Sequence, residues 1–129
     1  MAWVLPALVM TAIALSSQIP GRELPALFSH ADTWLHGLMY GTLGFSFIRA
    51  MRYWRPPLTV RHLGVSLLVT IAFGAIDECH QYFVPGRSME GYDLLADGVG
   101  IVLGMVLYLC YFRTRYVAPK TFSSAPSPL

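Results

Sequence analysis

The chain has 129 residues, of which 55% are hydrophobic and 12% charged, and its formal net charge at neutral pH is +2. Its mean hydropathy of +0.53 lies outside the range of ordinary soluble domains. The slight basic excess is explained by the membrane topology rather than by nucleic-acid binding. The composition therefore predicts an integral membrane protein, with the lipid bilayer as its first partner.

Four apolar runs follow one another along the chain, over residues 2–19, 34–48, 63–76 and 94–112. A helix needs about 20 predominantly apolar residues to cross the hydrocarbon of a bilayer, and each run reaches that length with its flanks. We predict an all-α, polytopic membrane protein with a bundle of four transmembrane helices in residues 1–118. Residues 119–129, rich in Pro and Ser, are expected to form a disordered cytoplasmic tail.

The first run also has features of a cleaved signal peptide, because small residues from Ala14 to Ser17 resemble a cleavage site. No basic residue precedes the run, however, and it is longer than the ~7–15 residues of a signal-peptide core. We therefore expect it to remain in the protein as the first membrane helix.

The basic residues are distributed unevenly between the connections. The connection between the second and third runs and the segment after the fourth hold Arg49, Arg52, Arg55, Arg61, Arg113, Arg115 and Lys120. The other two connections hold only Arg22 and Arg87. Since cytoplasmic loops are enriched in Lys and Arg, both termini are predicted to face the cytoplasm of a bacterial inner membrane.

Ionisable and polar side chains gather at the opposite, extracytoplasmic ends of the second, third and fourth runs. They are Asp32, His36, Asp77, Glu78, His80, Gln81, Arg87, Glu90, Asp93 and Asp97. Charge beside a bilayer is costly, so such a cluster is a candidate functional site. We expect these side chains to meet in one pocket open to the cell exterior.

Helical spacing supports this convergence. The fourth run carries Asp93 and Asp97 in line with Gly100 and Gly104, whose Gly-x-x-x-Gly spacing recurs at Gly37 and Gly41 in the second run; these glycines are predicted to form packing faces.

The third helix and its C-terminal turn add to the same pocket. Gly74, Glu78 and Gln81 share one face, with Asp77 one turn from Gln81, and in the second run Asp32 lies one turn from His36. Pro85 and Gly86 suit the centre of a tight turn, which would hold Arg87 over the helix ends.

These positions together resemble a known family. The series Glu78, Gln81, Pro85, Gly86, Arg87, Asp93, Asp97, Gly100 and Gly104, with Ser16, Ser17, Gln18, Asp32, His36 and Tyr40 upstream, is similar to the VanZ-like family of bacterial membrane proteins. The resemblance covers roughly residues 14–108 as an ordered set of motifs. Two positions depart from it: Thr33 stands where members often carry Lys, and Asp97 where Asn is common.

The resemblance implies a cell-envelope protein linked to glycopeptide (teicoplanin) resistance, because the family is named after an accessory protein of resistance gene clusters. Three functions remain open. The first is binding of an envelope lipid or lipid-linked molecule, with Arg87 meeting an anionic group and Asp32, His36, Gln81 and Asp93 completing the ligand-binding site. The second is an enzyme acting on an envelope lipid, with Glu78 and Asp97 as catalytic acid and base. The third is a proton-coupled carrier, which four helices would form only as an oligomer.

Plainer roles exist for single residues. Asp93 is also suited to be the N-cap of the fourth helix, and Arg87 to neutralise neighbouring acids or meet lipid phosphate. His36, Glu78, His80 and Asp97 have metal-ligating side chains, but their spacing matches no metal signature, so we predict no metal and no cofactor.

Overall fold

The computed structural model describes residues 1–20, 31–87 and 91–116, and these contain helices and no strand. The helices are α1 (Val4–Ser16), α2 (Ala31–Trp54), α3 (Val60–Gln81) and α4 (Gly91–Tyr116). The predicted all-α class and number of helices are confirmed. The predicted tail, residues 119–129, lies outside the described residues.

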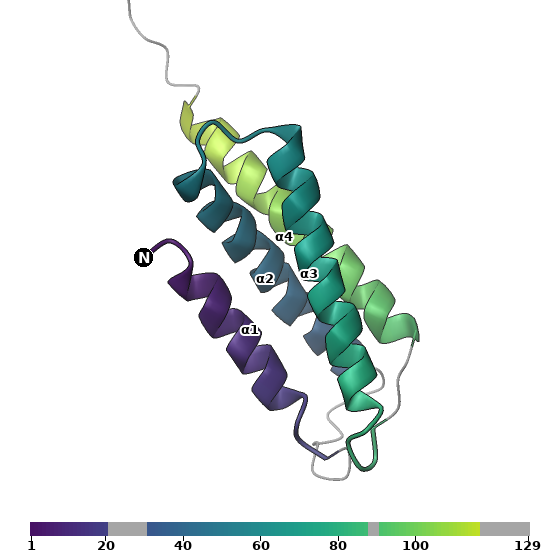
Figure 1. Cartoon of the computed structure of the whole chain (residues 1–129). Coiled ribbons are helices and arrows are strands. Elements are labelled where there is room, and N and C mark those ends of the chain that lie inside the picture. Colours follow the sequence, from purple (N-terminus) through teal and green to yellow (C-terminus); the bar gives the residue numbers. More distant parts are fainter. Residues whose placement is uncertain (21–30, 88–90, 117–129) are drawn as a thin grey trace, which may run out of the picture.

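Successive helices run in opposite directions (Figure 1). The end of α1, the start of α2, the end of α3 and the start of α4 therefore meet at one end of the bundle, which we call the polar end. The end of α2 and the start of α3, with their arginines, lie at the other end, the basic end. The chain topology thus brings the predicted site residues of three helices to the same end.

Two of the described helices are long and apolar enough to cross a membrane, α3 and the Gly91–Phe112 part of α4. Helix α1 is apolar but has 13 residues, which gives it a length of about 20 Å. Helix α2 has 24 residues, but His36, Arg49 and Arg52 lower its hydropathy. Membrane-spanning capacity by length and composition is therefore seen for two of the four predicted spans.

The distribution of polar and apolar side chains on α3 is the reverse of that in a soluble protein. Its buried residues are Ser66, Thr70, Gly74, Asp77, Glu78 and Gln81. Leu68 and Ile76, by contrast, expose 70% and 69% of their surface. Apolar side chains exposed along whole helices indicate a surface that contacts something other than water, and a bilayer fits the composition.

Glycines allow α2 and α4 to pack backbone against backbone. A Cβ atom added at Gly100 would overlap the carbonyl oxygen of Gly37, and one at Gly104 would overlap that of Gly41. The predicted packing faces are confirmed, and they face each other. Close approach of this kind is the function of small residues at helix interfaces in membranes.

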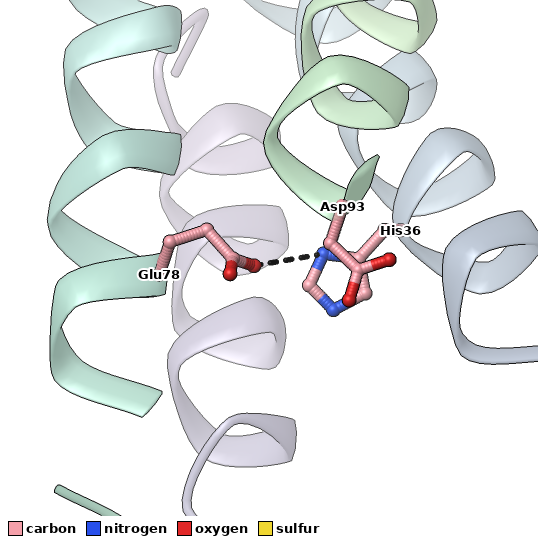
Figure 2. Close-up of side chains that lie close together, drawn as sticks. All are labelled: His36, Glu78 and Asp93. Atoms are coloured by element: carbon pink, nitrogen blue, oxygen red, sulfur yellow. Dashed lines mark ion pairs between the residues drawn. The ribbon is translucent and has the colours of Figure 1, made fainter. Parts of the chain in front are cut away.

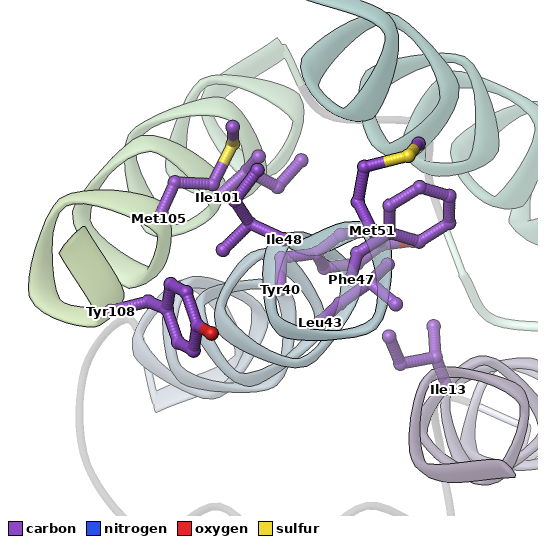
Figure 3. Close-up of a cluster of buried hydrophobic side chains, with 9 residues drawn as sticks. All are labelled: Ile13, Tyr40, Leu43, Phe47, Ile48, Met51, Ile101, Met105 and Tyr108. Atoms are coloured by element: carbon purple, nitrogen blue, oxygen red, sulfur yellow. The ribbon is translucent and has the colours of Figure 1, made fainter. Parts of the chain in front are cut away.

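The apolar core is centred on α2, which supplies most of its buried side chains. Its buried side chains include Leu43 and Ile48 from α2, Ile101 from α4 and Ile13 from α1. Figure 3 shows the α2 side chains between those of α4 and Ile13. Its fully buried members come from α1, α2 and α4, and Leu63, Leu67 and Phe73 of α3 pack against them.

The predicted tight turn follows α3. The backbone N–H of Arg87 donates to the carbonyl of Val84 at 3.0 Å, which closes a turn with Pro85 and Gly86 at its centre. Gly86 has a φ of 76°, a conformation required after the proline in a type II turn and accessible to glycine without strain.

Candidate functional site

Asp77 is the centre of a hydrogen-bond network that joins three helices. Its Oδ2 accepts hydrogen bonds from the Ser17 hydroxyl at 2.7 Å, the Gln81 amide at 3.1 Å and the Tyr40 hydroxyl at 3.3 Å. The carboxylate is buried, and three donors compensate for the loss of water. Asp77 therefore has a structural role that holds α1, α2 and α3 together.

Arg87 extends this network to the end of α1. Its guanidinium donates to Gln81 Oε1 at 3.1 Å and to the backbone carbonyls of Ser16 and Ile19, both at 3.3 Å. Ser16 is the last residue of α1 and Ile19 follows it, so the arginine links the end of α1 to the turn after α3. The predicted position over the helix ends is confirmed, and in this structure the partners of the guanidinium are protein groups.

Replacing Arg87 by Ala should loosen α1 from the rest of the bundle. The carbonyls of Ser16 and Ile19 would lose their charged donor, and we expect a loss of about 1–3 kcal/mol in the free energy of unfolding. Hydrogen exchange by mass spectrometry should show faster exchange in α1 than in α4. The control is Arg61→Ala, an exposed arginine at the basic end, which should leave the exchange of α1 unchanged.

Glu78, next to Asp77 on α3, has a different environment. Its side chain is 0% exposed, and neither carboxylate oxygen has a hydrogen-bond partner among the described residues. The His36 ring faces it, with Nδ1 3.4 Å from Glu78 Oε1 and 3.1 Å from Asp97 Oδ1. Asp97 is also buried, and its Oδ2 has no partner in the described part of the chain. A buried carboxylate without a hydrogen-bond partner lowers the stability of the fold, so such a group is a candidate for catalysis or for binding an ion.

Asp93 brings α4 into the same place. Helix α4 begins at Gly91, so Asp93 lies within its first turn, and the N-cap interpretation is wrong. Its carboxylate accepts a hydrogen bond from the Thr33 hydroxyl at 2.8 Å. Asp93, His36 and Glu78 each place a potential ligand atom within 4.8 Å of the others. Figure 2 shows the carboxylates of Glu78 and Asp93 converging on the His36 ring from two helices.

The predicted site residues therefore separate into two groups. His36, Glu78, Asp93 and Asp97 form the acid–histidine cluster, whereas Gln81 and Arg87 belong to the Asp77 network. The side chain of Asp32 and residue Glu90 lie outside the described residues.

Some partners were placed differently or missed by sequence reasoning. His80 is exposed, and its Nε2 lies 2.8 Å from the Gln18 amide, so it does not join the cluster as the metal-site alternative supposed. Sequence reasoning also missed the contacts of Ser17, Thr33 and Tyr40. The family resemblance had marked all three positions, Ser17 and Tyr40 as matches and Thr33 as a departure, but it did not indicate their partners.

A comparison with known protein families agrees with the motif resemblance. Residues 3–113 match the family model described as VanZ/LLP1. The chain belongs to the VanZ/LLP1 family. Neither a curated protein nor a solved structure matches it.

This VanZ/LLP1 protein also has an apolar groove on the outer side of α2 and α4. The groove measures about 510 Å³ and is lined by residues that include Thr33, Gly37, Leu38, Val99 and Leu103. A second depression of about 380 Å³ shares Gly37, Leu38 and Leu103 with it and continues along the same two helices. The groove exists because the glycines leave the helix contact without side chains.

Proposed function

We propose that this VanZ/LLP1 protein spans the bacterial inner membrane with four helices, both termini in the cytoplasm, and binds a lipid-linked cell-envelope molecule at its extracytoplasmic side. Family membership and the apolar, exposed outer faces of the helices support the membrane assignment. The arginines at the basic end support the orientation, because cytoplasmic loops are rich in them.

The observation that carries the proposal is the position of Thr33. Its side chain lines the apolar groove and donates a hydrogen bond to Asp93. The groove is therefore linked to the buried acid–histidine cluster through the Thr33–Asp93 hydrogen bond. A lipid-linked molecule has the same two parts: its chain would lie in the groove between α2 and α4, and its polar group would reach Asp93.

The chemistry of the cluster favours a polar group that donates hydrogen bonds. Glu78, Asp93 and Asp97 all present carboxylates, whereas the guanidinium of Arg87 is bound to protein carbonyls and Gln81. Amines and sugar hydroxyls complement carboxylates, and a bare phosphate would be repelled by them. Holding such an envelope molecule is the contribution we propose to glycopeptide (teicoplanin) resistance.

Filling the groove should weaken the binding of an amphiphile whose head group carries an amine and sugar hydroxyls. Val99, 52% exposed, lines the groove, so Val99→Trp should occupy the space of the chain. We expect the affinity for dodecyl glucosaminide to fall at least about tenfold, as judged by native mass spectrometry of the purified protein. The matched control is Ile76→Trp, a bulky substitution at an exposed position of α3 outside the groove, which should bind like the wild type.

A second probe tests the preference for the head group. Dodecyl phosphate has the same chain, and we expect it to bind more weakly than dodecyl glucosaminide. Equal binding of both amphiphiles by the wild type, or equal loss of binding in the two Trp variants, would count against the proposed site.

One observation favours a second candidate, an enzyme acting on the same envelope lipid. The buried Glu78 carboxylate has no hydrogen-bond partner and lies 3.4 Å from His36 Nδ1, an arrangement suited to proton transfer to a bound substrate. This candidate requires chemical change in the bound lipid, which mass spectrometry of lipid recovered from the protein would detect. Recovery of unchanged lipid would leave binding as the function.

A further inference from the structure

We propose that His36, Glu78 and Asp93 bind a divalent transition-metal ion of the Mn²⁺ or Zn²⁺ class. The three residues come from α2, α3 and α4, and each offers one ligand atom within 4.8 Å of the other two. Glu78 and Asp93 are buried, and the His36 side chain is 11% exposed. Three ligands from three different helices would thus surround one position at the polar end of the bundle (Figure 2).

The second observation is the lack of partners for Glu78. Within the described residues, both its oxygens are buried without a hydrogen bond, and the same holds for Asp97 Oδ2. The neighbouring Asp77, on the same helix, has three donors around one oxygen. Among the described residues, the structural acid has three hydrogen-bond donors, whereas Glu78 has only the His36 ring at 3.4 Å, which is the condition expected of a carboxylate whose partner is a bound cation.

Asp97 adds a third carboxylate beside the same histidine. Its Oδ1 lies 3.1 Å from His36 Nδ1, the ring nitrogen that also lies 3.4 Å from Glu78 Oε1. Carboxylates next to a metal-binding histidine help to fix its ring plane. We assign Asp97 this positioning role beside the three ligands.

The donor set selects the class of ion. Imidazole nitrogen together with carboxylate oxygen suits Mn²⁺ and Zn²⁺, whereas Mg²⁺ and Ca²⁺ prefer oxygen ligands alone. Two carboxylate ligands also balance the charge of a divalent ion, which matters in apolar surroundings. Sequence spacing predicted no metal because the ligands are spread over 58 positions from His36 to Asp93 and no short motif contains them.

The experiment measures Mn²⁺ binding to the full-length protein in detergent micelles after removal of metal with EDTA. Continuous-wave electron paramagnetic resonance gives the affinity, and electron spin echo modulation detects nitrogen bound to the ion. We expect saturable binding of one ion per chain, a nitrogen signal from imidazole, and displacement of Mn²⁺ by Zn²⁺. His36→Gln should remove the nitrogen signal, and Glu78→Gln should lower the affinity at least about tenfold.

His80→Gln is the matched control, because His80 is an exposed histidine two residues from Glu78 and outside the cluster. It should retain both the affinity and the nitrogen signal. Absence of saturable binding, a nitrogen signal that persists in His36→Gln, or one that is lost in His80→Gln would each overturn the proposal. The nitrogen signal is recorded on the wild-type protein, so its absence there is decisive even where a variant fails to fold. A cluster that holds only a shared proton would give no signal, and the result is independent of amphiphile binding.

Discussion

Replacing Gly104 by Leu should separate α2 from α4 and lower the free energy of unfolding by more than about 3 kcal/mol. The reason is geometric: a Cβ atom at this position would overlap the backbone carbonyl of Gly41, which cannot move without displacing α2. The groove on the same two helices would be lost as well. Unfolding in mixed micelles with increasing SDS, followed by circular dichroism, measures the effect.

Gly98→Leu is the matched control for this variant. Gly98 lies on the same helix, and a Cβ atom there would meet nothing within 4 Å, so the same substitution should change stability by less than about 0.5 kcal/mol. If both variants unfold equally easily, the sensitivity of α4 comes from the added bulk on any face. The close approach of the two backbones would then not be what holds α2 and α4 together.

The glycine faces could be predicted from the sequence because their information is local. A Gly-x-x-x-Gly pair lies on one face of a helix whatever the rest of the chain does, and two such pairs can only be useful if another helix approaches. The same holds for the turn at Pro85 and Gly86, where two adjacent residues specify the backbone. Local spacing also placed Gly74, Glu78 and Gln81 on one buried face of α3.

The partner of each acid could not be predicted, because it depends on how helices far apart in sequence are aligned. Thr33 and Asp93 are 60 positions apart, as are Ser17 and Asp77, and a shift of one turn between helices would change both pairs. The alternative role of Asp93 as an N-cap also failed, because α4 begins at Gly91 and Asp93 lies in its first turn.

The length of α1 also could not be predicted from the hydropathy pattern. The first apolar run covers residues 2–19, but α1 ends at Ser16. The Ser16 hydroxyl donates to the carbonyl of Ile13, a local bond that competes with the regular helix pattern. The Ser17 hydroxyl donates to Asp77, so the end of α1 is fixed by the same network that holds the polar end together.

Neutralising the two adjacent acids of α3 should change stability in opposite directions. Asp77→Asn places an amide group among the donors of Ser17, Tyr40 and Gln81, and we expect the free energy of unfolding to fall by about 2–3 kcal/mol. Glu78→Gln removes a buried carboxyl group that has no hydrogen-bond partner among the described residues. It also loses the attraction to His36 at 3.4 Å, and we expect a net rise of about 1 kcal/mol in metal-free buffer.

The comparison is informative because the two residues share a helix, a depth and a charge. SDS unfolding in the presence of EDTA measures both variants under the same conditions, with the wild type as the reference. Functional sites often carry groups that destabilise the fold, so a gain in stability for Glu78→Gln beside a loss for Asp77→Asn would support a functional role for Glu78. Destabilisation of similar size in both variants would instead place Glu78 in the structural network with Asp77. The acid–histidine cluster would then not be the functional site.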